Sequence, residues 1–391
     1  MYSVTVTYTV RKHYTCFVKN LWQRTISNTN YENICTYTKK MIATEIPFKA
    51  SDKTTIYRLC FKSNNPNAVP KAICHICHGM AEHAKRYERL ATELVNHGFI
   101  VYSNDHRGHG QTALEFQQNP LGVAISKKQR RLNGLTPDVD PLHEKYLSNG
   151  FERIILDLKE MVMEEKKQYY DKPFIMLGHS MGSVIAHTFA GRYGDMLDGL
   201  ALSGVVARPN MILSAGTPLL LSGINLFVNV DSTSSLLHML TVGAYPAQVQ
   251  YSKEEMKKHE DGTLEKTEND WLSRDPNEVD KFNKDPLCGF QCSVGFYLDF
   301  LPCLIALKDS TKAMKNYPKD LPCYIMCGEK DPCGEFGYAA EQIIAEFKRV
   351  GAQSPKVSIY SGARHEIFNE INRDEVTNDF ITWCNLQVSK L

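Results

Sequence analysis

Hydrophobic and polar positions follow two different periods along this chain. Short apolar runs typical of buried strands occur at residues 72–77, 99–103, 173–177, 197–202, 323–326 and 356–360. Apolar residues at helical spacing occur between them, at residues 87–97, 151–170, 181–193, 336–350 and 374–387. Strands that alternate with helices predict a mostly parallel sheet covered by helices on both faces. Two more strands, at 44–48 and 54–62, are expected around a turn near the start.

The alternation is interrupted once. Residues 205–315 show no strand–helix unit, and the pattern resumes at 323. We therefore predict one α/β domain over residues 42–391 with a cap inserted at about 205–315. Residues 211–230 carry no charge and are long enough to cross a bilayer. Their polar and helix-breaking residues are too many for a good span, so we expect part of a cap whose apolar face lines a pocket or touches a membrane.

Residues 1–41 differ from the rest in composition. They are basic, and their first acidic residue is Glu32. Such a start is typical of an organelle transit peptide, but the segment is rich in Thr, Tyr and Val, which are poor helix formers. We expect a poorly ordered extension, with targeting or a membrane-touching arm as the alternatives.

Composition narrows the classes of function. The 391 residues carry 45 basic and 44 acidic side chains, and a net charge of +1 does not favour a nucleic-acid partner. The chain has 12 cysteines and no secretory signal pattern, so reduced thiols and a cytoplasmic location are expected. Cys74 and Cys77 lie in a predicted strand with His75 and His78, but alternation along the strand puts the two thiols on opposite faces. We therefore expect no metal site there.

The strongest chemical signal is at residues 178–182, which have the sequence Gly-His-Ser-Met-Gly between a predicted strand and a predicted helix. This is the context of a nucleophile elbow, the strained turn that presents the catalytic serine in the α/β-hydrolase fold. The positions two before and two after Ser180 must be small for the turn to close. The helix that begins at Met181 offers free N–H groups to a developing oxyanion.

A serine nucleophile needs a base and an orienting carboxylate, which follow it in this fold in the order acid, then histidine. Asp331 follows the strand at 323–326, and His365 follows the strand at 356–360. His365 is also the only histidine after His259. Asp331 is favoured by its place at the loop tip, with Glu329 as its rival.

The backbone N–H of Met80, after the strand at 72–77, is expected to complete an oxyanion hole with that of Met181. The Asp-His-Arg-Gly-His-Gly sequence of residues 105–110 is predicted to be a structural turn, because glycines at such spacing serve backbone geometry. Cys333 lies two residues beyond Asp331 and is either near the site or an inert filler. No metal or organic cofactor is expected for this chemistry.

Several segments together resemble the monoglyceride lipase and lysophospholipase-like branch of α/β hydrolases. They are His-Gly-Met-Ala-Glu-His at 78–83, the turn at 105–110, the elbow at 178–182, Asp-Pro-Leu-Cys at 285–288 and Gly-Ala-Arg-His-Glu at 362–366. The resemblance covers roughly residues 42–390. It implies that Glu82 and Arg86 lie at the polar end of the substrate pocket. The animal enzymes have a second histidine three positions after the catalytic one, where this chain has Phe368.

The resemblance implies a serine hydrolase that cleaves a monoacylglycerol, or a similar lipid-like single-chain ester, through an acyl-enzyme on Ser180. A lysophospholipase, a thioesterase, an aminopeptidase or a cofactor-free peroxidase on the same scaffold are alternatives. An aminopeptidase needs an acidic anchor for the substrate amine, and Glu82 would be the candidate. A non-catalytic hydrolase-like binding protein is a further alternative. The cap would give peripheral membrane contact, and the oligomeric state is left open.

Overall fold

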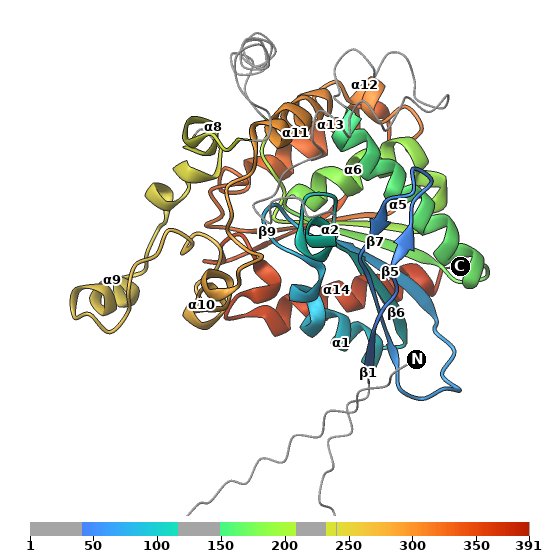
Figure 1. Ribbon diagram of the computed structural model, residues 1–391, viewed down its shortest axis with the longest axis horizontal. Coiled ribbons are helices and arrows are strands. Elements are labelled where there is room, and N and C mark those ends of the chain that lie inside the picture. The colour runs from blue at the N-terminus through green and yellow to red at the C-terminus, as the bar shows by residue number, and fades with distance from the viewer. Residues whose placement is uncertain (1–40, 116–148, 209–231, 240, 391) are drawn as a thin grey trace, which may run out of the picture. The chain divides into compact units, whose positions relative to one another are not determined.

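The computed structural model describes residues 41–115, 149–208, 232–239 and 241–390 (Figure 1). They belong to a compact unit that spans Lys39–Leu391. The predicted extension up to residue 40 and the uncharged stretch at 211–230 lie outside the described residues. Among the described helices, none is both long and apolar enough to cross a membrane.

In the described part of the chain, eight strands form the central sheet in the order β1-β4-β6-β5-β7-β8-β9-β10. Strand β4 runs antiparallel to both of its neighbours, and the strands from β6 to β10 are parallel. Their bounds are β1 Met41–Glu45, β4 Arg58–Ser63, β5 Ala72–Cys77, β6 Phe99–Asn104, β7 Phe174–His179, β8 Gly199–Ser203, β9 Cys323–Gly328 and β10 Lys356–Tyr360. The mostly parallel α/β arrangement is thus confirmed.

The start of the sheet differs from the expected pair of strands. The chain leaves the sheet after Glu45 and forms a separate hairpin of β2 (Phe48–Lys49) and β3 (Thr55–Ile56) before β4 begins. The predicted turn at residues 51–53 closes this hairpin. The prediction joined the hairpin strands to the sheet strands β1 and β4, because apolar residues alternate without a break through both.

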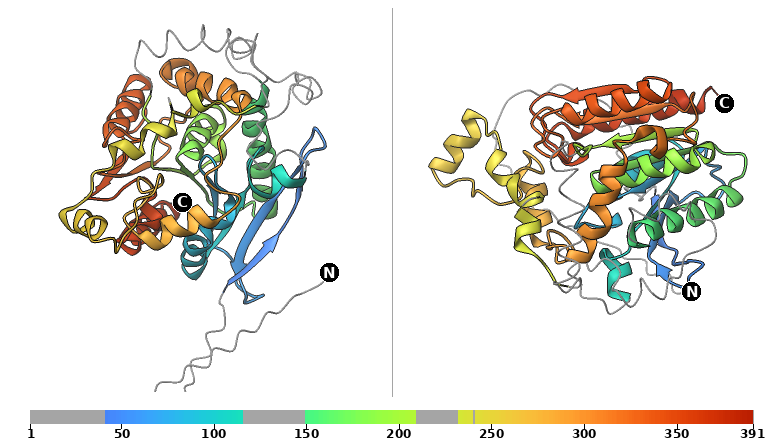
Figure 2. Two further views of the ribbon diagram at one scale, coloured as in Figure 1. Left: turned by 60° about the vertical axis from the view of Figure 1, so that its left-hand side comes forward. Right: turned by 90° about the horizontal axis from the view of Figure 1, so that it is seen from above.

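Helices cover both faces of the sheet (Figure 2). Helices α1 (Glu88–Asn96) and α14 (Arg373–Val388) pack on one face, and α5 (Asn149–Gln168), α6 (Met181–Tyr193) and α13 (Tyr338–Val350) pack on the other. Successive strand residues serve opposite faces, so Cys74 belongs to the core under α1 whereas Cys77 belongs to the core under α6. The two thiols thus lie on opposite faces of the sheet, as expected from the alternation along the strand.

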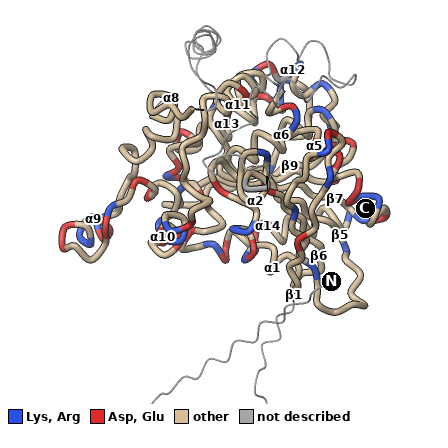
Figure 3. The backbone as a smooth tube through the Cα atoms, in the orientation of Figure 1, with Lys and Arg blue, Asp and Glu red and all other residues tan. Residues whose placement is uncertain are grey.

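The insertion lies between β8 and β9. It contains α8 (Ser235–Met239), α9 (Lys253–Glu260), α10 (Pro276–Lys284), α11 (Val294–Ala306) and α12 (Ser310–Ala313), and its described residues add no strand to the central sheet. Helix α11 packs on α5, and its apolar residues belong to the main core. Charges of both signs are mixed along α9 and α10 (Figure 3). Helix α11 therefore belongs to the body of the domain, and the part of the insertion before it is called the cap below.

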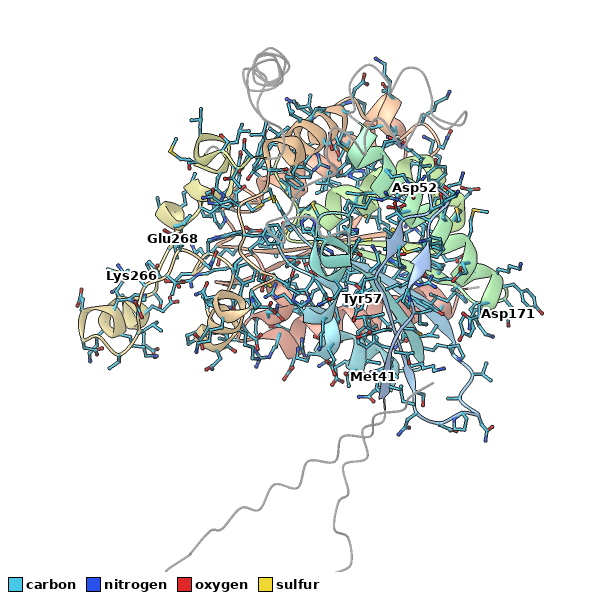
Figure 4. All side chains as sticks on the ribbon, viewed as in Figure 1. Met41, Asp52, Tyr57, Asp171, Lys266 and Glu268 are labelled. Atoms are coloured by element: carbon cyan, nitrogen blue, oxygen red, sulfur yellow. The ribbon has the colours of Figure 1, made fainter. Side chains whose placement is uncertain are left out.

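The turn at residues 105–110 is structural, as predicted. Asp105 accepts hydrogen bonds from the N–H groups of Ala84 and Gln111 at 2.8 and 2.7 Å. A Cβ on Gly110, whose φ is +49°, would lie 2.1 Å from Asp105 Oδ2. Arg107 donates at 2.7 Å to Asp52, whose place in the fold is labelled in Figure 4. The turn therefore ties the loop after β6 to the loop that precedes α1.

Candidate active site

Ser180 lies at the tip of a backbone turn that only small flanking residues permit. Its φ of +53° and ψ of −120° are unusual for a residue with a side chain. A Cβ on Gly178 would lie 2.2 Å from the Gly182 carbonyl oxygen, and a Cβ on Gly182 would lie 2.1 Å from the Cys77 carbonyl oxygen. The N–H of Ser180 donates to Ser203 O on β8 at 2.9 Å. The elbow therefore has the geometry that its sequence indicated.

Asp331 and His365 come together at the carboxyl ends of β9 and β10. His365 Nδ1 donates to Asp331 Oδ2 at 2.9 Å, and both side chains are buried. Asp331 Oδ1 accepts from the N–H of Cys333 at 2.9 Å, which fixes the carboxylate. The rival carboxylate, Glu329, is half-buried and accepts from the N–H of Gly362 at 2.7 Å, away from the histidine. The structure thus brings Asp331, and not Glu329, to the histidine.

The charge of Asp331 sets the acidity of His365. Burial alone would lower the pKa of His365, but the charge and hydrogen bond of Asp331, with the further negative charges of Glu366 and Glu82, hold that pKa above its ordinary value. His365 Nε2 has no hydrogen-bond partner among the described residues. Its bond to Ser180 Oγ is therefore not formed in this structure, and catalytic hydrogen bonds commonly tighten only with substrate bound.

Gly79 brings the loop after β5 against Ser180. A Cβ on Gly79 would lie 3.1 Å from Ser180 Cβ and 3.4 Å from the ring of His179. That ring also packs on His365, with 4.8 Å between the ring centroids. The ring of His179 is therefore in contact with both the loop of Gly79 and the ring of His365. Among the described residues, the N–H groups of Met80 and Met181 donate to no acceptor, as an oxyanion hole requires.

His78 holds the peptide that carries the Met80 N–H. Its Nδ1 donates to Gly79 O at 2.7 Å, and its Nε2 accepts from the N–H of His106 at 2.9 Å. Burial and the neighbouring imidazoles of His106 and His109 keep the pKa of His78 well below its ordinary value, so the ring is neutral and Nε2 can accept. Because a trans peptide is planar, fixing the Gly79 carbonyl also fixes the opposite direction of the Met80 N–H.

Glu82 and Arg86 form part of a buried ion network. Arg86 donates to Glu82 at 2.5 Å and to both carboxylate oxygens of Glu366 at 2.6 and 2.8 Å. Glu82 also accepts from the N–H of Gly79 at 2.5 Å and from the hydroxyl of Tyr87 at 2.9 Å. The network joins the loop of Met80 to the loop of His365. The contact of Glu82 and Arg86 with substrate remains a prediction.

The cap holds the loop of His365 through its backbone. The N–H of His365 donates to Trp271 O at 3.3 Å, and the N–H of Glu366 donates to Leu272 O at 2.7 Å. The Trp271 ring packs on that of His365 at 4.9 Å between centroids. Arg364 donates to the carbonyls on either side of this pair, at Asp270 and Ser273. These contacts could not be predicted from the sequence, because backbone pairing between distant segments leaves no spacing signal.

An apolar cluster between the cap and the loop after β9 adjoins Asp331 and His365. Trp271, Leu272, Phe282 and Cys333 form its buried part, and Val206, Tyr245, Val249 and Cys288 pack against it. Burial and the nearby Asp331 raise the pKa of the Cys333 thiol, which therefore stays protonated. Cys333 lies near the site as an apolar neighbour of Asp331. Phe368 packs on Phe380 at 5.7 Å between ring centroids, in the core under α14.

Comparisons with known proteins show the family of the chain. The model of a family described as "Serine aminopeptidase, S33" matches residues 68–372, which is more than half of the chain. The chain belongs to this family. A monoglyceride lipase of Mus musculus is 27% identical over 328 residues, which cover 83% of this chain and 84% of that protein. A monoacylglycerol lipase of Mycolicibacterium smegmatis is 24% identical over 330 residues, which cover 83% and 92% of the two chains.

Solved structures show the family fold. The crystal structure of a carboxyl esterase from Bacillus coagulans, in complex with glycerol, matches with a TM-score of 0.68 at 24% identity. The match covers 88% of this chain and 99% of that one. The α/β-hydrolase fold is thus confirmed, and the family supports a serine hydrolase.

The pH dependence of hydrolysis should report the pair of Asp331 and His365. A base must be neutral, so kcat/KM should rise with pH through the pKa of His365, which Asp331 holds above about 6.5. Asp331→Asn removes the negative charge that favours the imidazolium. It should move this limb to lower pH and reduce kcat by about 10⁴-fold. The measurement is a pH–rate profile with a soluble p-nitrophenyl ester.

Glu329→Gln is the control for this profile and should leave the limb in place. If Glu329→Gln shifts the limb and Asp331→Asn does not, the acid of the triad is wrongly assigned.

The Arg86–Glu366 pair should position the two catalytic loops. Burial would raise the pKa of Glu366, but the charge and hydrogen bonds of Arg86 lower it to about 2, so the pair is ionic at neutral pH. Glu366→Gln should destabilise the fold by on the order of 3 kcal/mol, because Arg86 loses a buried counter-charge. It should also reduce kcat more than it raises KM. Urea unfolding and steady-state kinetics measure both effects.

Glu254→Gln removes an exposed i,i+4 partner of Lys258 on α9 and serves as the control. It should change neither measurement. A higher KM with unchanged kcat in Glu366→Gln would instead favour direct contact of this network with substrate.

Proposed function

We propose that the protein hydrolyses monoacylglycerols to glycerol and a fatty acid, through an acyl-enzyme on Ser180. The observation that carries this proposal is the hydrogen-bonded pair of His365 and Asp331 beside the strained Ser180, with the apolar cap cluster adjoining it. A triad beside an apolar cluster suits an ester whose acyl part is a single hydrocarbon chain. The names of the curated relatives point to the same substrate.

The reaction follows from the roles of these groups. His365 takes the proton of Ser180 as Oγ attacks the ester carbonyl, and then gives that proton to the glycerol oxygen as it leaves. Asp331 keeps His365 in the tautomer that carries its proton on Nδ1, so that Nε2 is free to accept the proton of the serine. The N–H groups of Met80 and Met181 stabilise the oxyanion. Water then attacks the acyl-enzyme by the same steps and releases the fatty acid.

The surroundings of Glu82 favour an ester over a peptide amine as substrate. An aminopeptidase would use a carboxylate to hold the free α-ammonium group. The carboxylate of Glu82 already accepts from Gly79, Tyr87 and Arg86, so both of its oxygens are engaged within the protein. This supports an esterase activity for this chain, although the description of its family names a serine aminopeptidase.

Substrate comparison tests the proposal. Purified full-length protein should release fatty acid from 2-oleoylglycerol faster than from lysophosphatidylcholine, and should leave amino-acid anilides and acyl thioesters nearly intact. Ser180→Ala should reduce turnover by on the order of 10⁵–10⁶, whereas Ser389→Ala, at the end of α14, should retain it. Fatty acid release is measured by mass spectrometry.

Each other result has a definite meaning. Faster release from the lysolipid would make the protein a lysophospholipase, and hydrolysis of anilides alone would make it an aminopeptidase. Equal turnover of wild type and Ser180→Ala would remove Ser180 from the mechanism.

We further propose that the cap touches a membrane surface. Leu236 and Met239 on α8 are 53% and 54% exposed, and the sequence just before them contains the uncharged residues 211–230. Exposed apolar side chains on a short helix gain free energy when they enter the interfacial region of a bilayer. A lipid-like substrate would then reach the site from that surface.

Vesicle sedimentation tests this contact. The double variant Leu236→Glu, Met239→Glu should bind phosphatidylcholine vesicles several-fold less than wild type does, because two charges would enter an apolar layer. Tyr170→Glu alters a residue that is 86% exposed and precedes β7, at the sheet end opposite the site, so it should bind as wild type does. Equal binding of all three proteins would contradict membrane contact through α8.

A further inference from the structure

A second group of ligand-type side chains lies outside the triad. His83, Asp285 and Cys288 each offer one donor atom, and these three atoms lie within 4.8 Å of one another. His83 follows the loop of Met80, and the other two follow α10 in the cap. His83 Nε2 donates to Asp285 Oδ2 at 2.9 Å across a separation of 202 residues. Sequence spacing therefore gives no signal of this group.

The two cap ligands are carried by one tight turn. The N–H of Cys288 donates to Asp285 O at 3.0 Å, and the N–H of Leu287 donates to Asp285 Oδ1 at 2.9 Å. Pro286 occupies the second position of the turn, where its fixed φ is favourable. Asp285 Oδ1 is thus used by the turn, and Oδ2 faces His83. The three groups are held in place before any ligand arrives.

The charges around the thiol favour a cation. Glu82, Asp285 and Glu366 all act on Cys288, against the single positive charge of Arg86. Glu82 and Glu366 carry two negative charges against the one positive charge of Arg86. With the charge of Asp285, the net charge of these four groups is −2. His83 is largely buried, whereas Asp285 and Cys288 are partly exposed, so an ion can reach the group from solvent.

We propose that His83, Asp285 and Cys288 form a binding site for a divalent cation of intermediate softness, of which Zn²⁺ is the type. One imidazole, one carboxylate and one thiolate suit such an ion, and a water molecule completes four-fold coordination. On binding, His83 ligates the ion through Nε2 with its ring proton on Nδ1, and the proton of the Cys288 thiol goes to solvent.

The ion would join the cap to the loop that carries the oxyanion donor. One link exists already, since the N–H of Gly289 donates to Ala81 O at 2.9 Å. Ala81 follows Met80 directly, and Gly289 follows Cys288 directly. A metal ion between His83 and Cys288 adds a second and stronger link beside it. The cap would then open less readily, and Zn²⁺ should slow turnover without occupying the triad.

Metal binding to the full-length protein tests the site independently of its substrate. Zn²⁺ titration followed by calorimetry should show one equivalent bound. Co²⁺ in its place should give the near-ultraviolet absorption of a cobalt–thiolate bond. Cys288→Ser and His83→Gln should each weaken Zn²⁺ binding by roughly 10- to 100-fold or more, and Cys288→Ser should abolish the cobalt–thiolate band. Circular dichroism checks that both variants are folded.

Two control variants exclude other thiols. Cys333→Ser removes the thiol of the second ligand-type group, Asp331, Cys333 and His365, and should leave Zn²⁺ affinity unchanged. The double variant Cys16→Ser, Cys35→Ser removes thiols of the amino-terminal extension and should do the same. The proposal is overturned if wild type binds no Zn²⁺, if Cys288→Ser and His83→Gln bind as wild type does, or if Cys333→Ser is the variant that loses binding.

Discussion

The backbone crowding around Ser180 is the constraint on which the site depends. Gly182 lies so close to the Cys77 carbonyl, and Gly178 so close to the Gly182 carbonyl, that no side chain fits at either position. This close packing of α6 against β5 and β7 holds Ser180 at a positive φ, which costs of order 1–3 kcal/mol locally. The strain is sustained because the helix and both strands are buried on all sides. The half-buried serine lies at the tip of the turn as a consequence of this packing.

Polar links between loops then assemble the rest of the site around this fixed point. The Arg86 fork holds the oxyanion loop to the histidine loop, and the carbonyls of Trp271 and Leu272 hold the cap to that same loop. His78 orients the peptide between Gly79 and Met80 through its hydrogen bond to the Gly79 carbonyl. Each link lies between segments that are far apart in the chain, so the site forms only when the whole domain has folded. The proposed metal site would extend this set of links across the cap.

Much of the fold could be predicted because its signals are local. Apolar runs and helical spacing located the parallel strands and their helices, and Gly178 and Gly182 marked the elbow through a requirement for small residues. Asp331 and His365 could be chosen because α/β sheets place their sites at the carboxyl ends of strands. The hairpin of β2 and β3 was missed because a hairpin and sheet strands share the same alternation. The roles of Trp271, Glu366 and Cys288 depend on contacts across the cap, and no local pattern encodes them.

Covalent labelling with a fluorophosphonate tests the central claim most directly. Such a probe reacts with a serine only when a base and an oxyanion hole activate it. Peptide mapping by mass spectrometry should place the adduct on Ser180 in the folded wild type, and His365→Gln should reduce the labelling rate to near background. An adduct on another serine, or equal labelling of His365→Gln, would contradict the triad of Ser180, Asp331 and His365.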